Sequence, residues 1–129
     1  MGNLFIAPTK RTPEIIFLDS GSLNIKGSSI PEDSVNFYKP ILQWLEDFLQ
    51  SAPLSVSFTI DLEYINTSST IHILKLLNTT IHNITKKTAL QIVWKFDAED
   101  EDSLEQGEMI QKIIKHPMLF VKTQPDTTR

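Results

Sequence analysis

The stretch that decides the fold spans residues 54–70 and reads LSVSFTIDLEYINTSST. From Leu54 to Leu62, apolar side chains occupy every second position and polar side chains occupy the positions between them. This period of two is typical of a strand with one buried face. Four hydroxyl residues follow Asn66, a composition favoured in the first turn of a helix. The stretch therefore predicts a strand that passes directly into a helix.

Three segments carry apolar residues at intervals of three or four positions, the spacing of one face of a helix. One follows the hydroxyl run and predicts a helix over 68–85. Another predicts an amphipathic helix over 35–50, which Pro53 prevents from continuing. The third predicts a helix towards the end of the chain, and its apolar residues are Leu104, Met109, Ile110, Ile113 and Ile114.

Short apolar segments predict the remaining strands. Residues 14–18 and 22–26 flank the turn sequence Asp19-Ser20-Gly21 and predict a β-hairpin. Residues 89–96 predict a central strand, because they are rich in β-branched and aromatic side chains, and residues 118–121 predict a short last strand. Because strands and helices alternate after the hairpin, the sequence predicts the α/β class, with a mixed sheet covered by helices.

Length and composition are those of one ordinary domain. The chain has 129 residues, of which 40% are hydrophobic and 22% are charged. Such values are typical of soluble globular domains, so we predict one domain over 1–122 and a frayed tail over 123–129. The net charge of −4 provides no positive field for phosphate backbones, and nucleic acid is therefore not an expected partner.

Two further properties narrow the class of protein. The chain contains no cysteine, which excludes disulfides and thiolate metal sites. No apolar run approaches the roughly 18 residues of a membrane-spanning helix, and the N-terminal residues lack the basic flank of a signal peptide. We therefore expect no membrane insertion and a cytoplasmic location.

The run Asn66-Thr67-Ser68-Ser69-Thr70 supports two interpretations. One is a helix cap, in which Asn, Ser or Thr side chains accept hydrogen bonds from the free N–H groups of the first turn. A cap accounts for one such residue, whereas the run supplies five. The other is a phosphoacceptor, because a phosphate at a helix N-terminus meets unpaired N–H donors and the positive end of the helix dipole. The residue types alone leave both interpretations open.

Acidic residues crowd the stretch 97–108 and allow three interpretations. A calcium loop of the EF-hand type fits poorly, because Asp102 stands where the sharp turn requires glycine. A solvated loop whose carboxylates favour the start of the third helix is the simplest interpretation. The third is a surface that docks a basic patch on a partner. The candidate docking residues are Asp100, Glu101, Asp102, Glu105 and Glu108.

The sequence lacks the nucleophile elbow, the Walker loop, the dinucleotide-binding glycines and the zinc-protease motif. We therefore expect neither catalysis nor a cofactor, and no metal site. His72 and His82 lie on one predicted helix, about 15 Å apart along its axis, which is too far to share a metal. A small enzyme or ligand-binding domain that uses the stretch 97–108, with a divalent cation, remains the alternative. The aromatic residues predicted for the core are Phe37, Tyr38, Trp44, Phe48 and Trp94.

Several short motifs together resemble those of the SiaC-type regulatory phosphoproteins. The central motif is Tyr64-Ile65-Asn66-Thr67-Ser68-Ser69. Matching residues elsewhere are Thr12-Pro13-Glu14-Ile15, Ile30-Pro31-Glu32, Phe37-Tyr38, Trp44-Leu45, Trp94, Asp100-Glu101-Asp102, Glu105, Gly107 and Glu108. The resemblance extends from about Leu4 to Val121 and implies a fold like the STAS domain of anti-anti-sigma factors. The family usually carries lysine two residues after the second serine, where Ile71 stands here.

The resemblance implies a signalling switch rather than a catalyst. In this family the threonine of the Asn-Thr-Ser-Ser motif, here Thr67, is phosphorylated by a kinase with a histidine-kinase-like ATPase fold, and a PP2C-type phosphatase removes the phosphate. The unmodified form is expected to bind and activate a diguanylate cyclase, which raises cyclic di-GMP and favours biofilm growth. Asn66, Ser68 and Ser69 are expected to shape the loop and the helix cap, and Tyr64 to pack behind the loop.

Overall fold

Six strands form a sheet whose spatial order equals their order along the chain. The computed structural model describes residues 1–123. The strands are β1 (Leu4–Ile6), β2 (Glu14–Phe17), β3 (Ser22–Ser29), β4 (Ser55–Ile65), β5 (Ala89–Asp97) and β6 (Leu119–Thr123). The helices are α1 (Ser34–Leu49), α2 (Thr67–Asn83) and α3 (Glu101–Ile114).

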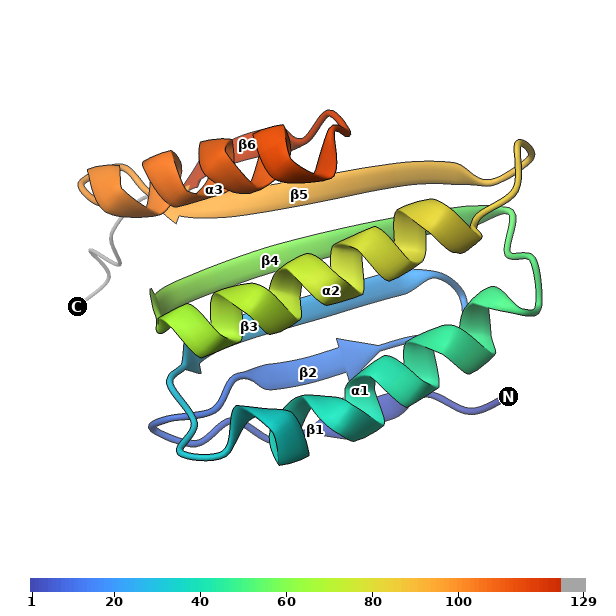
Figure 1. Ribbon diagram of the computed structural model, residues 1–129, viewed down its shortest axis with the longest axis horizontal. Helices are drawn as coiled ribbons and strands as arrows, with labels where there is room; N and C mark the ends of the chain where they lie inside the picture. The colour runs from blue at the N-terminus through green and yellow to red at the C-terminus, as the bar shows by residue number, and fades with distance from the viewer. Residues whose placement is uncertain (124–129) are drawn as a thin grey trace.

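The sheet is mixed, as predicted. β1, β2 and β3 pair antiparallel, whereas β3, β4, β5 and β6 pair parallel. One helix joins each parallel pair, and all three helices cover the same face of the sheet (Figure 1). This follows because such crossovers share one hand, and each of the three moves one strand in the same direction. The α/β class is confirmed.

The core lies between the sheet and the helices and follows the period of two in β4. Val56, Phe58 and Ile60 point towards the helices and are buried, whereas the residues between them face the other side. The aromatic residues predicted for the core divide into two groups. Tyr38, Phe48 and Trp94 are buried, and Phe37 and Trp44 are partly buried where they pack against the core.

β1 is an edge strand that the sequence pattern does not predict, because three residues are too few to show a period. Leu4 and Ile6 lie opposite Phe17 and Ile15 of β2 and pack against the core. The β1 backbone therefore extends the predicted hairpin to three antiparallel strands.

Other boundaries differ from the predicted ones by a few residues. α2 spans Thr67–Asn83 instead of 68–85, and α3 begins at Glu101, inside the acidic stretch. β6 extends to Thr123, one residue past the predicted end of the domain. The rest of the predicted tail, residues 124–129, lies outside the described residues. Within residues 1–123, the helices lack the length and apolar character that a membrane crossing requires.

All three helices begin at the same edge of the sheet, where β3, β4 and β5 end (Figure 1). The first N–H groups of a helix have no partner within the helix, so this edge presents hydrogen-bond donors from three helices. The hydroxyl run and the acidic stretch both lie there. The topology therefore brings together the two segments that the sequence marked as functional.

Candidate functional site

Thr67 is the first residue of α2 and follows β4 with one residue between them. Its side chain is exposed to solvent. Among the described residues its hydroxyl group makes no hydrogen bond with the protein, although those of its neighbours do. The hydroxyl group of Thr67 is therefore accessible from solvent at this edge of the sheet.

Asn66 is the N-cap of α2, which confirms the cap interpretation for this residue. Its backbone is extended, with φ −91° and ψ 171°. Its side-chain oxygen accepts hydrogen bonds from the N–H of Ser69 at 2.9 Å and from the hydroxyl of Ser68 at 3.1 Å. Its backbone N–H donates to the carbonyl of Ser29 at 3.1 Å and so ties the loop to the end of β3. The conformation of the loop before Thr67 is therefore fixed from both sides.

The four hydroxyl groups of the run differ in accessibility. Ser69 is fully buried and Thr70 is 8% exposed. Ser68 is exposed, but its hydroxyl group is engaged with Asn66. Of the four, Thr67 alone combines an exposed side chain with a hydroxyl group that has no partner within residues 1–123.

A buried hydrogen-bond chain links the start of α2 to β3 and α1. Ser29 Oγ donates to Ser69 Oγ at 2.7 Å and lies 2.5 Å from the hydroxyl of Tyr38. Because a serine hydroxyl has one proton, Tyr38 is the donor to Ser29. Burial raises the pKa of Tyr38. Ser69 therefore has a structural role at the start of α2, and its hydroxyl group is closed to solvent.

Sequence reasoning missed this chain, because Ser29 and Tyr38 come from distant segments. The only available signal was a tyrosine at a core position of a predicted helix, since a buried tyrosine hydroxyl needs a partner.

Tyr38 also packs against His72 of α2. The two rings are stacked, with centroids 5.1 Å apart and planes inclined by 8°. They line a groove of about 180 Å³ between α1 and α2, together with Lys75 and Glu46. Partial burial, followed by the positive charge of Lys75, lowers the pKa of His72. These two effects favour the neutral form of the imidazole beside Tyr38.

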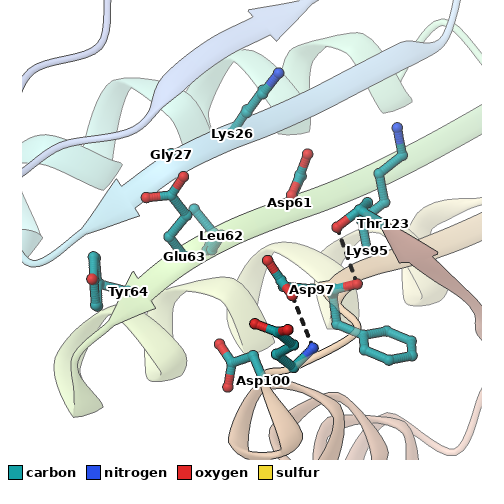
Figure 2. A pocket seen from close by; sticks show the side chains of 12 residues that line it. Lys26, Gly27, Asp61, Leu62, Glu63, Tyr64, Lys95, Asp97, Asp100 and Thr123 are labelled. Carbon is teal, nitrogen blue, oxygen red and sulfur yellow. Dashed lines mark hydrogen bonds between the residues drawn. The ribbon is translucent and has the colours of Figure 1, made fainter. Parts of the chain in front are cut away.

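The prediction that Tyr64 packs behind the loop is wrong. Its side chain is 65% exposed and projects from the end of β4 (Figure 2). The cause is a bulge: Gly27 lies opposite Leu62 and Ser28 lies opposite Tyr64, so Glu63 is an extra residue on β4. An extra residue reverses the alternation of the strand, which turns Tyr64 away from the core.

Three exposed apolar side chains lie towards the same edge of the sheet as Thr67, a feature that sequence reasoning also missed. Val35 in the first turn of α1, Tyr64 at the end of β4 and Ile71 of α2 are each at least 60% exposed. Ile71 follows Thr67 by four positions and therefore lies on the same face of α2. Exposed apolar side chains at one edge of a domain are typical of a surface that binds another protein. Ile71 at the usual lysine position was the one sequence signal for this property.

The acidic stretch contributes to the start of α3. Asp100 is its N-cap and accepts a hydrogen bond from the N–H of Ser103 at 3.0 Å, and Asp97 accepts one from the N–H of Glu99 at 2.8 Å. Glu101 and Asp102 occupy the first turn, where carboxylates interact favourably with the helix dipole. In the part of the chain that the structure describes, no group of three or more His, Asp or Glu residues is arranged to hold a metal ion.

The remaining carboxylates of α3 point to solvent. Glu101, Asp102, Glu105 and Glu108 are exposed. The side-chain amide of Gln106 donates to Thr70 Oγ1 at 2.8 Å and so fixes α3 against the first turn of α2. The first turns of α2 and the middle of α3 are therefore in contact through Gln106.

Comparison with known proteins gives consistent matches. The model of the family described as SiaC family regulatory phosphoprotein matches residues 6–123. An uncharacterised protein of Pseudomonas aeruginosa strain UCBPP-PA14 is 26% identical over 118 residues, which cover 91% of this chain and 94% of that protein.

Solved structures give the same result. SiaC of Pseudomonas aeruginosa is 26% identical and matches with a TM-score of 0.77 over 97% of this chain and all of that one. In the crystal structure of the diguanylate cyclase SiaD in complex with its activator SiaC, from the same species, the matching chain is 25% identical. It matches with a TM-score of 0.86 over 93% of this chain and 99% of that one.

Proposed function

Because the chain belongs to the SiaC family of regulatory phosphoproteins, we propose that it is a non-catalytic switch whose state is set by phosphorylation of Thr67. A kinase with a histidine-kinase-like ATPase fold adds the phosphate, and a PP2C-type phosphatase removes it. The unmodified form binds and activates a diguanylate cyclase and thereby raises cyclic di-GMP. The switch works in the cytoplasm, where its nucleotide-using partners act.

The observation that carries this proposal is the exposed, unbonded hydroxyl of Thr67 at the start of α2. Ser69 and Thr70 are buried, and the hydroxyl of Ser68 is used in the cap. The N-terminal position also suits a phosphate, because the helix dipole and free N–H groups favour negative charge there. The complex of SiaD with SiaC in Pseudomonas aeruginosa supports a diguanylate cyclase as the partner.

The charge of the phosphate explains how modification changes binding. Phosphorylation adds about −1.5 to −2 charges at neutral pH. The surrounding surface docks through Val35, Tyr64 and Ile71, whose apolar side chains become desolvated in a complex. A phosphate within such an interface loses its water or meets acidic groups of the partner, and like-charge contacts in interfaces cost several kcal/mol. The unmodified protein therefore binds, and the phosphorylated protein dissociates.

We assign the acidic residues of α3 to the same docking surface. Glu101, Asp102, Glu105 and Glu108 are exposed on α3, which contacts the first turn of α2 through Gln106, whereas Asp100 is the helix cap. They fit a basic patch on a partner, and charges at the rim of an interface mainly accelerate association.

Mass spectrometry of the protein purified from its own cells tests the modification. We expect one added phosphate group, located at Thr67, in the wild type and in Ser68→Ala. Thr67→Ala is expected to lose it. A phosphate found at Ser68 in the wild type would contradict the assignment.

Binding of the purified diguanylate cyclase from the same cells tests the switch. Thr67→Ala is expected to bind like the unmodified protein, and Thr67→Glu to bind at least about tenfold more weakly, which equals about 1.4 kcal/mol. Stability provides the control, because a carboxylate at the start of α2 should stabilise the fold by about 0.3–1 kcal/mol. A Thr67→Glu protein that is folded and binds as tightly as the wild type would refute the charge mechanism.

A further inference from the structure

The face of the sheet opposite the helices carries no helix within residues 1–123 (Figure 1). Figure 2 views this face, with helices behind the strands. Its side chains are those that alternate with the core residues, and they lie in rows because the strands pair in register. The residues in these rows indicate what kind of partner surface fits this face.

One row consists of charges of alternating sign. Glu14 of β2 lies opposite Lys26 of β3, Lys26 opposite Asp61 of β4, and Asp61 opposite Lys95 of β5. Among the described residues none of these four charges forms an ion pair, since the one ion pair there joins Arg11 to Glu32. Lys26, Asp61 and Lys95 line a hollow of about 720 Å³ (Figure 2).

The adjacent row is apolar at both ends and polar in the middle. It runs across all six strands through Phe5, Ile16, Asn24, Thr59, Val93 and Leu119. Phe5 is 65% exposed and Leu119 is 49% exposed. Val93 has little exposed surface but does not belong to the core cluster under the helices.

If a second copy of the sheet faces the first with its strands in reversed order, each row meets side chains that match it in charge or polarity. Reversal places Glu14 opposite Lys95 and Lys26 opposite Asp61, so every charge meets the opposite sign. In the other row, reversal places Phe5 opposite Leu119, Ile16 opposite Val93 and Asn24 opposite Thr59. A two-fold axis parallel to the strands, running between β3 and β4, performs this reversal on a face-to-face pair.

We propose that the helix-free face is the interface of a homodimer, in which a second copy of this chain packs face to face about that axis. Packed sheets keep their strands within about 30° of each other, which allows the central strands β3 and β4 to align with those of the partner. Five spacings of about 4.8 Å make the face roughly 24 Å wide. An interface of this size is small among those of stable protein complexes. We therefore expect the fraction of dimer to depend on protein concentration.

This dimer leaves the helices and the edge at Thr67 free. An axis parallel to the strands preserves the direction of the strands, so both copies present their helix N-termini at the same end. The two Thr67 residues then face one side of the assembly. None of the residues of the two rows belongs to the start of α2, although Tyr64 of the proposed docking surface lines the same hollow as Lys26, Asp61 and Lys95.

Sedimentation analysis over micromolar to millimolar concentration tests the dimer. Glu14 and Lys95 are separated by two strands within one chain, and they meet only across the two-fold axis. Glu14→Lys and Lys95→Glu should therefore each raise the dimer dissociation constant by about tenfold or more, because each creates two like-charge contacts. An equal mixture of the two variants should form heterodimers with a dissociation constant like that of the wild type. In the heterodimer, the side chains at positions 14 and 95 again carry opposite charges where they face each other.

Lys112→Glu is the matched control, since it reverses an exposed charge on α3, on the other side of the sheet. It should leave the dissociation constant unchanged, and circular dichroism checks that all variants are folded. A wild type that stays monomeric at millimolar concentration overturns the proposal and leaves the face to a different protein. The proposal is also wrong if both single variants still form the dimer as the wild type does. It is equally wrong if the mixture of the two variants does not associate.

Discussion

At the scale of the residue, the four adjacent hydroxyl groups of α2 have different roles because an α-helix turns by about 100° per residue. Ser69 and Thr70 point inward, to the buried chain and to Gln106. Ser68 turns back to the cap, and Thr67 points to solvent. Four neighbouring side chains of similar chemistry therefore differ in accessibility because of their orientation alone.

His72 gives a prediction at this scale. Its pKa is lowered in the folded protein, chiefly by burial, so the folded state binds fewer protons than the unfolded state, in which the pKa is near 6.5. The contribution of neutral His72 to stability is complete above pH 6.5 and is lost as the pH falls below that value. Urea unfolding between about pH 7.5 and about pH 5.5 should show a larger loss of stability for the wild type than for His72→Gln. Equal losses of stability in the two proteins would show that protonation of His72 does not cause the loss.

At the scale of the element, single residues decide how a strand or a helix meets its neighbour. The extra residue Glu63 turns Tyr64 from the core to the surface next to Thr67. Gly107 permits α3 to lie close to the sheet, where Trp94 donates from its indole N–H to the carbonyl of Ser103 at 3.0 Å. The position of the acidic face of α3 depends on this contact.

Substitution of Gly107 tests the contact between α3 and β5. A Cβ atom there would lie 2.7 Å from Trp94 and 2.9 Å from Phe120. Gly107→Ala should therefore destabilise the fold by about 1–3 kcal/mol through overpacking, although alanine favours a helix by about 1 kcal/mol. Chemical unfolding followed by tryptophan fluorescence measures the effect. Met109→Ala, at an exposed position of the same helix, should change stability by less than about 0.5 kcal/mol.

At the scale of the whole molecule, three crossovers of one hand leave the sheet with one covered and one open face. The covered face holds the core, and the edge where the helices begin holds the candidate switch. The open face carries the two self-complementary rows. The proposed switch therefore lies at the edge where the helices begin and the proposed dimer interface on the open face, and the two adjoin at Tyr64, which lines the same hollow as Lys26, Asp61 and Lys95.

Hydrogen exchange tests this arrangement as a whole. Amide protons of β3, β4 and β5 should exchange slowest, because each of these strands is paired on both sides. Those of β1 and β6 should exchange much faster, since face-to-face dimers leave both edges of the sheet unpaired. Protection of β1 or β6 equal to that of β4 would indicate that copies associate through strand edges instead of the open face.

The sequence by itself determined the α/β class and the described elements other than β1. The period of two in residues 54–62 and the helical spacing in 35–50 and 68–85 depend on local geometry, which each segment shows alone. The cap at Asn66 and the carboxylates at the start of α3 follow from the same local rules. The motif around Thr67 likewise pointed to the family that the comparisons identify.

Only the tertiary structure decided which of these residues are accessible and what they face. The burial of Ser69 depends on Ser29 and Tyr38, which approach it from two other elements. The exposure of Tyr64 depends on the pairing of β4 with β3, and the short strand β1 depends on β2. The self-complementary rows exist only once six strands are in register. Such properties arise from contacts between distant segments, and the pattern within one segment carries no information about them.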